Sequence, residues 1–152
     1  MPKREAGFFI VDMLIAIEII KRLSPAIKTA EDLLFDEQAW IVITRELEII
    51  GEAMKHVLDD TSLIALINTS WRDVVDFRNV VAHVYFNINA KTVFSIIKQN
   101  IPVLENEIFE LLKKYPDKES MKRTFEQSKI DLQSMRRAAG LAYLRYIETL
   151  IF

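Results

Sequence analysis

The amino-acid sequence predicts an all-α fold, an up-and-down bundle of four or five helices with one further helix added at the C-terminus. Strand signals are almost absent, whereas apolar residues recur at helical spacing through several long segments. Only 3 Gly and 4 Pro occur among 152 residues, so turns should be few and helices long. The content of 51% apolar and 28% charged residues is typical of one globular domain with a core.

The first two helices are predicted from periodicity and from the residues at their ends. The first should run from about Phe8 to Leu23, because Pro25 prevents continuation. The weakly periodic segment from Ala26 to Phe35 is interpreted as a partly helical connection. Asp36 is a good N-cap for a second helix that reaches about Leu58.

The central part of the chain is predicted to hold a short helical piece and two further helices. "DDTS" should end the second helix, and "SLIALI" should form the short piece. Ser70 and Asp73 fit a capping box at the start of a third helix, which covers "FRNVVAHVYF" and ends near "NINA". A fourth helix is expected from about Ala90 to Lys114, bent at Pro102.

The C-terminal segment is expected to continue the same domain. "YPDKES" is a plausible hinge, and Met121 to Phe152 is predicted to form a fifth, long helix. We therefore assign residues 1–115 to the helical bundle and residues 116–152 to a C-terminal helical extension.

Composition excludes several classes of protein. The net charge of −2 argues against nucleic-acid binding through overall positive charge, although a local basic patch is compatible with it. With no Cys and 2 His, neither disulfides nor a zinc cluster are expected, and we predict no metal and no cofactor. No signal peptide is recognised, and Asp12 and Glu18 interrupt the apolar run from Gly7 to Ile20, so no membrane span and a cytoplasmic location are expected.

The predicted third helix carries polar residues on two separate faces. At about 100° per residue, Arg78 and His83 lie roughly 140° apart, so one regular helix does not aim both at one point. Asn79 shares the face of His83, and Tyr85 shares the face of Arg78. The core-facing stripe comprises Val74, Phe77, Val80, Val81 and Val84.

A second apolar face of this helix also needs to be covered. Trp71, Val75 and Ala82 lie on the Arg78 face, away from the core stripe. Either a symmetric partner subunit or another helix of the same chain would bury them. The sequence leaves both alternatives open.

Taken alone, these polar residues are weak evidence for catalysis. A single His in an apolar helix is more often a structural hydrogen-bonding residue. Glu48 and Glu52 could suggest a di-metal bundle, but the Glu-x-x-His ligands of such sites are missing, so a solvated face or support for Arg78 fits better. His56 lies near a helix C-terminus, where a cation interacts well with the dipole, and is assigned no chemistry.

Three separated stretches nevertheless resemble a known family. "RNVVAHVY" fits R-N-x-x-x-H-x-Y, the motif of HepT-type toxins within the HEPN superfamily of ribonucleases. "RELEIIGEA" (Arg45 to Ala53) and Trp71, seven residues before Arg78, are similar to that family in the same order. The resemblance covers roughly Phe8 to Tyr115 and ends before the C-terminal segment.

The resemblance implies a HEPN-like bundle that forms a homodimer through the motif helix, with Trp71, Val75 and Ala82 at the interface. It also implies a metal-independent endoribonuclease, the toxin of a toxin–antitoxin pair, with catalytic Arg78, Asn79 and His83 from two subunits around one cleft. RNA is the implied substrate, and tRNA is one candidate. Tyr85 is the implied acceptor of AMP from a cognate minimal nucleotidyltransferase, the antitoxin.

Two alternatives remain at this point. The chain could instead be a non-catalytic helical dimer that serves as the substrate- or nucleotide-binding subunit of a nucleotidyltransferase. The C-terminal segment should pack on the bundle or on a partner, or its basic first half should help to bind RNA phosphates. The basic residues concerned are Lys122, Arg123, Lys129, Arg136 and Arg137.

Overall fold

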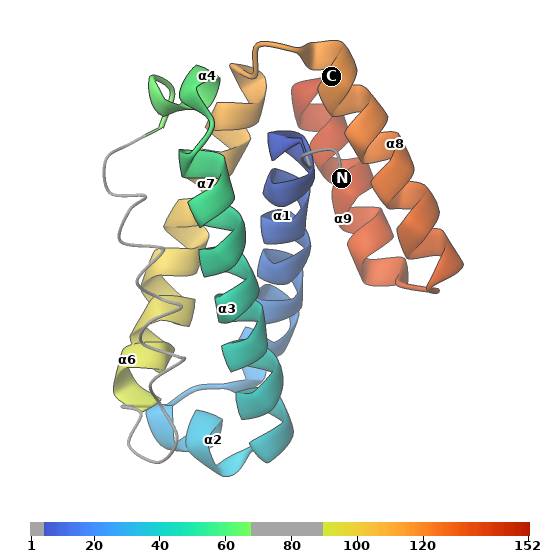
Figure 1. Cartoon of the computed structure of the whole chain (residues 1–152). Helices are drawn as coiled ribbons and strands as arrows, with labels where there is room; N and C mark the ends of the chain where they lie inside the picture. The colour runs from blue at the N-terminus through green and yellow to red at the C-terminus, as the bar shows by residue number, and fades with distance from the viewer. Residues whose placement is uncertain (1–4, 68–89) are drawn as a thin grey trace.

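The computed structural model describes residues 5–67 and 90–152, and its regular elements there are all helical (Figure 1). The predicted all-α class is therefore confirmed. The predicted third helix, which begins at Ser70, lies outside the described residues. In chain order the elements are α1 (Ala6–Leu23), the 3₁₀ turn η1 (Ser24–Ala26), α2 (Ala30–Phe35), α3 (Glu37–Leu58), α4 (Thr61–Ile64), α6 (Ala90–Ser95), the π-helix η3 (Ile96–Asn100), α7 (Ile101–Lys113), α8 (Lys118–Ser134) and α9 (Ala138–Ile151).

The predicted ends of the first two helices are close to those observed. α1 ends at Leu23, immediately before the 3₁₀ turn that contains Pro25. Asp36 caps α3 by accepting a hydrogen bond of 3.0 Å from the backbone N–H of Ala39. The connection between the two helices is partly helical, as expected, because Thr29 and Asp32 form a capping box that starts α2.

The helix that contains Pro102 is interrupted by a π-turn rather than by a simple bend. The backbone N–H of Ile101 bonds to the carbonyl of Ile96, five residues earlier. Proline has no N–H, and its ring crowds the carbonyl four residues before it, which here is that of Lys98. The wider π-turn in the residues just before Pro102 accommodates this loss, and α7 then continues to Lys113.

The prediction of one long C-terminal helix is wrong. α8 and α9 form an antiparallel hairpin, drawn in orange and red in Figure 1. The turn between them is a Schellman motif, in which the N–H of Arg137 bonds to the carbonyl of Leu132 (2.8 Å) and the N–H of Arg136 bonds to that of Gln133 (3.1 Å). Arg136 has a φ of 57°, a conformation that costs a non-glycine residue roughly 1–2 kcal/mol.

This break was not predicted because its usual sequence signals are missing. Neither Gly nor Pro occurs between Ser134 and Ala139. Gly140 comes later, where α9 packs so closely on α8 that a Cβ would lie 3.4 Å from the side chain of Leu132. The division of the chain at residue 115 remains our proposal.

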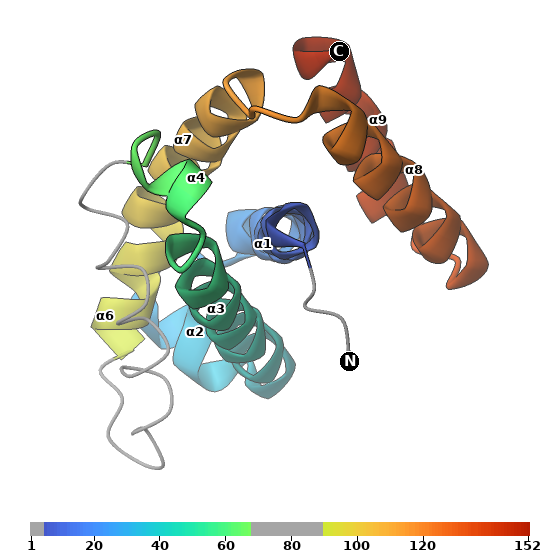
Figure 2. The same ribbon diagram turned by 45° about the horizontal axis from the view of Figure 1, so that its top comes forward.

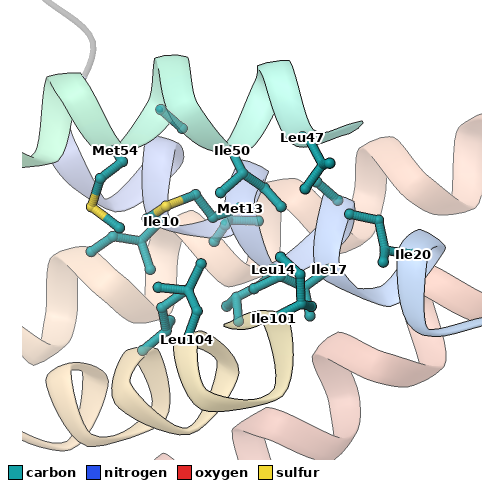
Figure 3. Close-up of a cluster of buried hydrophobic side chains, with 14 of the residues drawn as sticks. Ile10, Met13, Leu14, Ile17, Ile20, Leu47, Ile50, Met54, Ile101 and Leu104 are labelled. Carbon is teal, nitrogen blue, oxygen red and sulfur yellow. The ribbon is translucent and has the colours of Figure 1, made fainter. Parts of the chain in front are cut away.

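Helix α1 lies at the centre of the molecule. Figure 2 views it nearly end-on, with α3 and α7 beside it and the α8–α9 hairpin on the far side. Ile10, Leu14 and Ile17 are fully buried, and Figure 3 shows side chains of α3 and α7 closing over them. A fully buried side chain of this size contributes about 1.5–3 kcal/mol to folding. The other labelled core residues are Met13, Ile20, Leu47, Ile50, Met54, Ile101 and Leu104.

A buried carboxylate joins the hairpin to the bundle. Glu105 of α7 is only 7% exposed, and its oxygens lie 2.8 and 3.0 Å from Nζ of Lys21 on α1. The hydroxyl of Tyr143 on α9 donates a hydrogen bond to the same carboxylate. One acidic side chain thus holds three helices. Within residues 5–67 and 90–152 no helix is both long and apolar enough to cross a membrane.

We predict that Tyr143→Phe destabilises the protein. The substitution keeps the buried ring but removes a donor from a charged acceptor, which should lower the free energy of unfolding by about 1–3 kcal/mol. Burial and the neighbouring Glu105 carboxylate raise the pKa of Tyr143 above its ordinary value of 10.0. The folded state therefore holds the Tyr143 proton more tightly than the unfolded state does. The contribution of this proton to the free energy of unfolding is fully present below pH 10.0, and it declines as the pH rises above the ordinary pKa of tyrosine.

Urea unfolding at neutral and alkaline pH measures both effects. Tyr146→Phe is the matched control, since Tyr146 is an exposed tyrosine on the same helix. The alkaline decline should be shallower in Tyr143→Phe than in the parent. It should not vanish, because burial also raises the pKa of Tyr115. Equal stability of Tyr143→Phe and the control would contradict the proposed role of the Glu105 contact.

Candidate functional site

Most residues of the predicted site lie outside the described part of the chain. Arg78, Asn79, His83 and Tyr85 fall within residues 68–89, and so do the predicted interface residues Trp71, Val75 and Ala82. Among the residues predicted to form, support or modify the catalytic site or the dimer interface, the structure therefore places only Glu48 and Glu52.

Glu48 and Glu52 lie on the solvent side of α3 and pair with residues of that same helix. Glu48 accepts a hydrogen bond of 3.2 Å from Nη1 of Arg45, and an oxygen of Glu52 lies 3.6 Å from Nε2 of His56. Both carboxylates are more than a third exposed. Across residues 5–67 and 90–152, no three His, Asp or Glu side chains gather closely enough to hold a metal ion.

His56 makes a packing contact. Its ring stacks on Phe9 of α1, with ring centroids 4.2 Å apart and ring planes 8° from parallel. This stacking packs the end of α3 against the start of α1. The sequence assigned His56 no chemistry, and the stacking on Phe9 gives it a structural role.

A groove of about 660 Å³ lies where the bundle meets the turn of the hairpin. Its floor is the strip of α1 that α3, α7 and the hairpin leave uncovered, and its walls come from α3 and from the α8–α9 turn. The first turn of α9, which no side chain caps, also lines it. The lining residues are Asp12, Ile15, Glu18, Ile19, Arg22, Glu46, Ile49, Leu132, Met135, Arg136, Arg137, Ala138, Ala139 and Gly140.

The charged side chains of this groove differ in how closely they pair with an opposite charge. Arg22 is paired with Glu18, with Nε 2.9 Å from Oε1. Burial raises the pKa of Glu46, and the positive charges of Arg45 and Arg137 partly oppose that rise. The groove was missed by sequence reasoning because it requires the turn at Arg136, and an unbroken C-terminal helix would not create it.

Comparison with known proteins now decides the family. The family described as "Ribonuclease HepT-like" matches residues 13–111, a range that contains the R-N-x-x-x-H-x-Y motif at 78–85. The chain belongs to the HepT-like ribonuclease family. This finding confirms the resemblance seen in the sequence.

Two curated relatives show how far the similarity extends. A protein of Thermococcus cleftensis named "Probable ribonuclease HepT" is 32% identical over 112 residues, which cover 74% of this chain and 99% of the relative. "Putative RNase MJ1380" of Methanocaldococcus jannaschii is 28% identical over 113 residues, or 71% of this chain and 97% of the relative. No solved structure matches the chain. The hairpin α8–α9 begins beyond the residues that the family matches.

We predict that Glu48→Gln and Glu52→Gln each lower the free energy of unfolding by no more than about 0.5 kcal/mol, because exposed pairs on one helix contribute little. If these residues support Arg78, ribonuclease activity will fall although stability does not. Urea unfolding and RNA cleavage, measured on the same preparations, separate the two effects.

Glu110→Gln is the matched control, since Glu110 pairs with Lys113 at 3.0 Å on the exposed face of α7. Activity equal to that of the control in both variants would limit Glu48 and Glu52 to a solvated face. A stability loss well above that of the control would show that the pairs on α3 matter more than their exposure indicates.

Proposed function

We propose that this protein is a metal-independent endoribonuclease and the toxin of a toxin–antitoxin pair. The observation that carries the proposal is the match to the HepT-like ribonuclease family over residues 13–111, together with an intact R-N-x-x-x-H-x-Y motif at 78–85. The relatives named as ribonucleases are covered over nearly their whole length, so the similarity is to complete proteins.

The motif supplies the groups that metal-free RNA cleavage needs. A base must take the proton of the ribose 2′-OH, and an acid must protonate the 5′-oxygen that leaves. Imidazole, whose reference pKa is about 6.5, performs either task near neutral pH, which assigns His83 to proton transfer. The Arg78 guanidinium would hold the scissile phosphate and stabilise charge on its oxygens. Asn79 would orient the imidazole or bind phosphate.

A homodimer would complete this site. The chain has only two histidines, and His56 stacks on Phe9, so a single subunit offers one His for two proton transfers. Two motif helices facing each other would bring two His83 side chains to one cleft and bury Trp71, Val75 and Ala82. The expected products are a 2′,3′-cyclic phosphate and a 5′-hydroxyl.

Tyr85 would be the point of control. Transfer of AMP from ATP to its hydroxyl by a cognate nucleotidyltransferase, with release of pyrophosphate, would place phosphate charge on the predicted helix face that carries Arg78. Bulk and repulsion would then keep RNA from the cleft. The antitoxin is therefore expected to be an enzyme that modifies the toxin.

We predict that the purified protein cleaves cellular RNA in the presence of EDTA and that His83→Ala lowers the rate by about 10²–10⁴-fold, the usual contribution of a general acid or base. His56→Ala is the matched control and should retain cleavage below its melting temperature. The measurement is RNA cleavage followed by analysis of the new ends.

Two results would contradict this prediction. Absence of cleavage by the parent, with tight binding to the nucleotidyltransferase, would indicate the alternative of a non-catalytic binding subunit. A mass of 17.7 kDa by light scattering at micromolar concentration, rather than twice that value, would exclude the composite site.

We predict that the neighbouring nucleotidyltransferase and ATP increase the intact mass of the protein in steps of AMP. Tyr85→Phe should abolish the increase, because it removes the acceptor hydroxyl. Tyr146→Phe is the control, since Tyr146 is exposed and chemically equivalent. An increase that persists in Tyr85→Phe would place the modification elsewhere.

A further inference from the structure

The turn of the C-terminal hairpin carries an arginine at a position that favours glycine. Arg136 holds a φ of 57°, the one positive φ of a non-glycine residue within residues 5–67 and 90–152. At this point of a Schellman motif glycine is usual, because it has no Cβ to clash. A side chain kept in a costly conformation points to a role for the side chain itself.

The arginines of the turn differ from Lys122 and Lys129 of the same hairpin in forming no close ion pair. Lys129 lies 2.8 Å from Glu126 and 2.9 Å from Glu148, and Lys122 lies 3.5 Å from Glu119. Arg136 and Arg137 are exposed, and no close ion pair joins either of them to a residue within 5–67 or 90–152, although the charge of Arg137 acts on the partly buried Glu46. Of the basic residues that the sequence offered for phosphate binding, the turn thus presents two whose guanidinium groups are available.

Both arginines border the groove between the hairpin and the bundle. Figure 2 shows the tip of the hairpin standing away from α3, with α1 between them. The floor carries aliphatic side chains such as Ile15 and Ile19, and Arg22 lies on the same strip. An exposed guanidinium beside the aliphatic part of this mixed floor suits a ligand with both phosphate oxygens and flat, weakly polar groups.

We propose that Arg136 and Arg137 bind backbone phosphates of a single RNA strand that lies in this groove. The identification of the anion as RNA rests on the proposed function, because RNA is the polyanion that a ribonuclease must hold. Both arginines belong to the hairpin, beyond the residues that the family matches. It would therefore add binding energy for RNA that members without such a hairpin lack.

The acidic residues of the groove weaken the attraction between the two arginines and RNA phosphates but do not abolish it. Glu18 is neutralised by Arg22, and burial raises the pKa of Glu46, which favours its uncharged form. Asp12 also lines the groove, so the attraction should come from two phosphate contacts at the turn and not from a broad positive field. Two contacts to single-stranded RNA predict a contribution of about 1.4 to the slope of log affinity against log salt concentration.

The test measures binding of a labelled single-stranded RNA in which every ribose is 2′-O-methylated, so that no strand can be cleaved by 2′-OH attack. Arg136→Gly and Arg137→Gln should each weaken binding and lower the salt slope by about 0.7. Arg136→Gly should also raise the melting temperature by about 2–4 °C, because glycine relieves the backbone. Loss of binding by a stabilised variant excludes misfolding as the cause.

Arg123→Gln is the matched control, since Arg123 is exposed on α8 outside the groove and its loss changes the net charge equally. Binding by Arg136→Gly and Arg137→Gln equal to that of the control would overturn the proposal. Unchanged RNA binding by these two variants, together with lost binding to poly-L-glutamate, would also overturn the proposal. That result would indicate that the groove binds an acidic protein segment.

The RNA-binding test of the groove can fail or succeed separately from the test of ribonuclease activity. Loss of cleavage in His83→Ala with unchanged RNA binding in Arg136→Gly would leave the proposed function intact and remove this inference. Weakened binding in Arg136→Gly, with no cleavage by the parent protein, would support the groove and remove the proposed enzyme.

Discussion

The fold depends on the burial of α1. Apolar residues occupy more than half of its circumference, so a single partner helix cannot cover it, and α3, α7 and the C-terminal hairpin all pack against it. The strip left uncovered carries Asp12, Ile15, Glu18, Ile19 and Arg22 and becomes the floor of the groove. Core and groove are thus two consequences of how apolar and charged residues are distributed around one helix.

Elements with strong local signals could be predicted from the sequence. Pro25 and Asp36 mark the end of α1 and the start of α3, because a missing N–H and a capping carboxylate act within a few residues. The break between α8 and α9 could not be predicted. It rests on a left-handed Arg136, which has no compositional signal, and on packing between residues that are distant in sequence.

The candidate site also has one part that the sequence predicts and one part that it does not. Arg78, Asn79, His83 and Tyr85 follow a spacing that identifies the family, so the motif could be found from the residues alone. The groove could not, since Arg22 and Arg137 lie far apart in the chain and approach only because the hairpin folds back on α1. A linear pattern finds residues that are close together in the sequence, whereas a surface built from four helices needs the tertiary structure.

The contact between Glu105, Lys21 and Tyr143 limits which helical bundles could carry the α8–α9 hairpin. The hairpin brings the hydroxyl, but the bundle provides the acceptor and the cation that neutralises it. Transplanted onto a bundle with an aliphatic residue in place of Glu105, the same hairpin would bury a hydroxyl without a partner and leave Lys21 without its carboxylate. The C-terminal hairpin is therefore not an interchangeable module, because part of its docking site is encoded in the bundle.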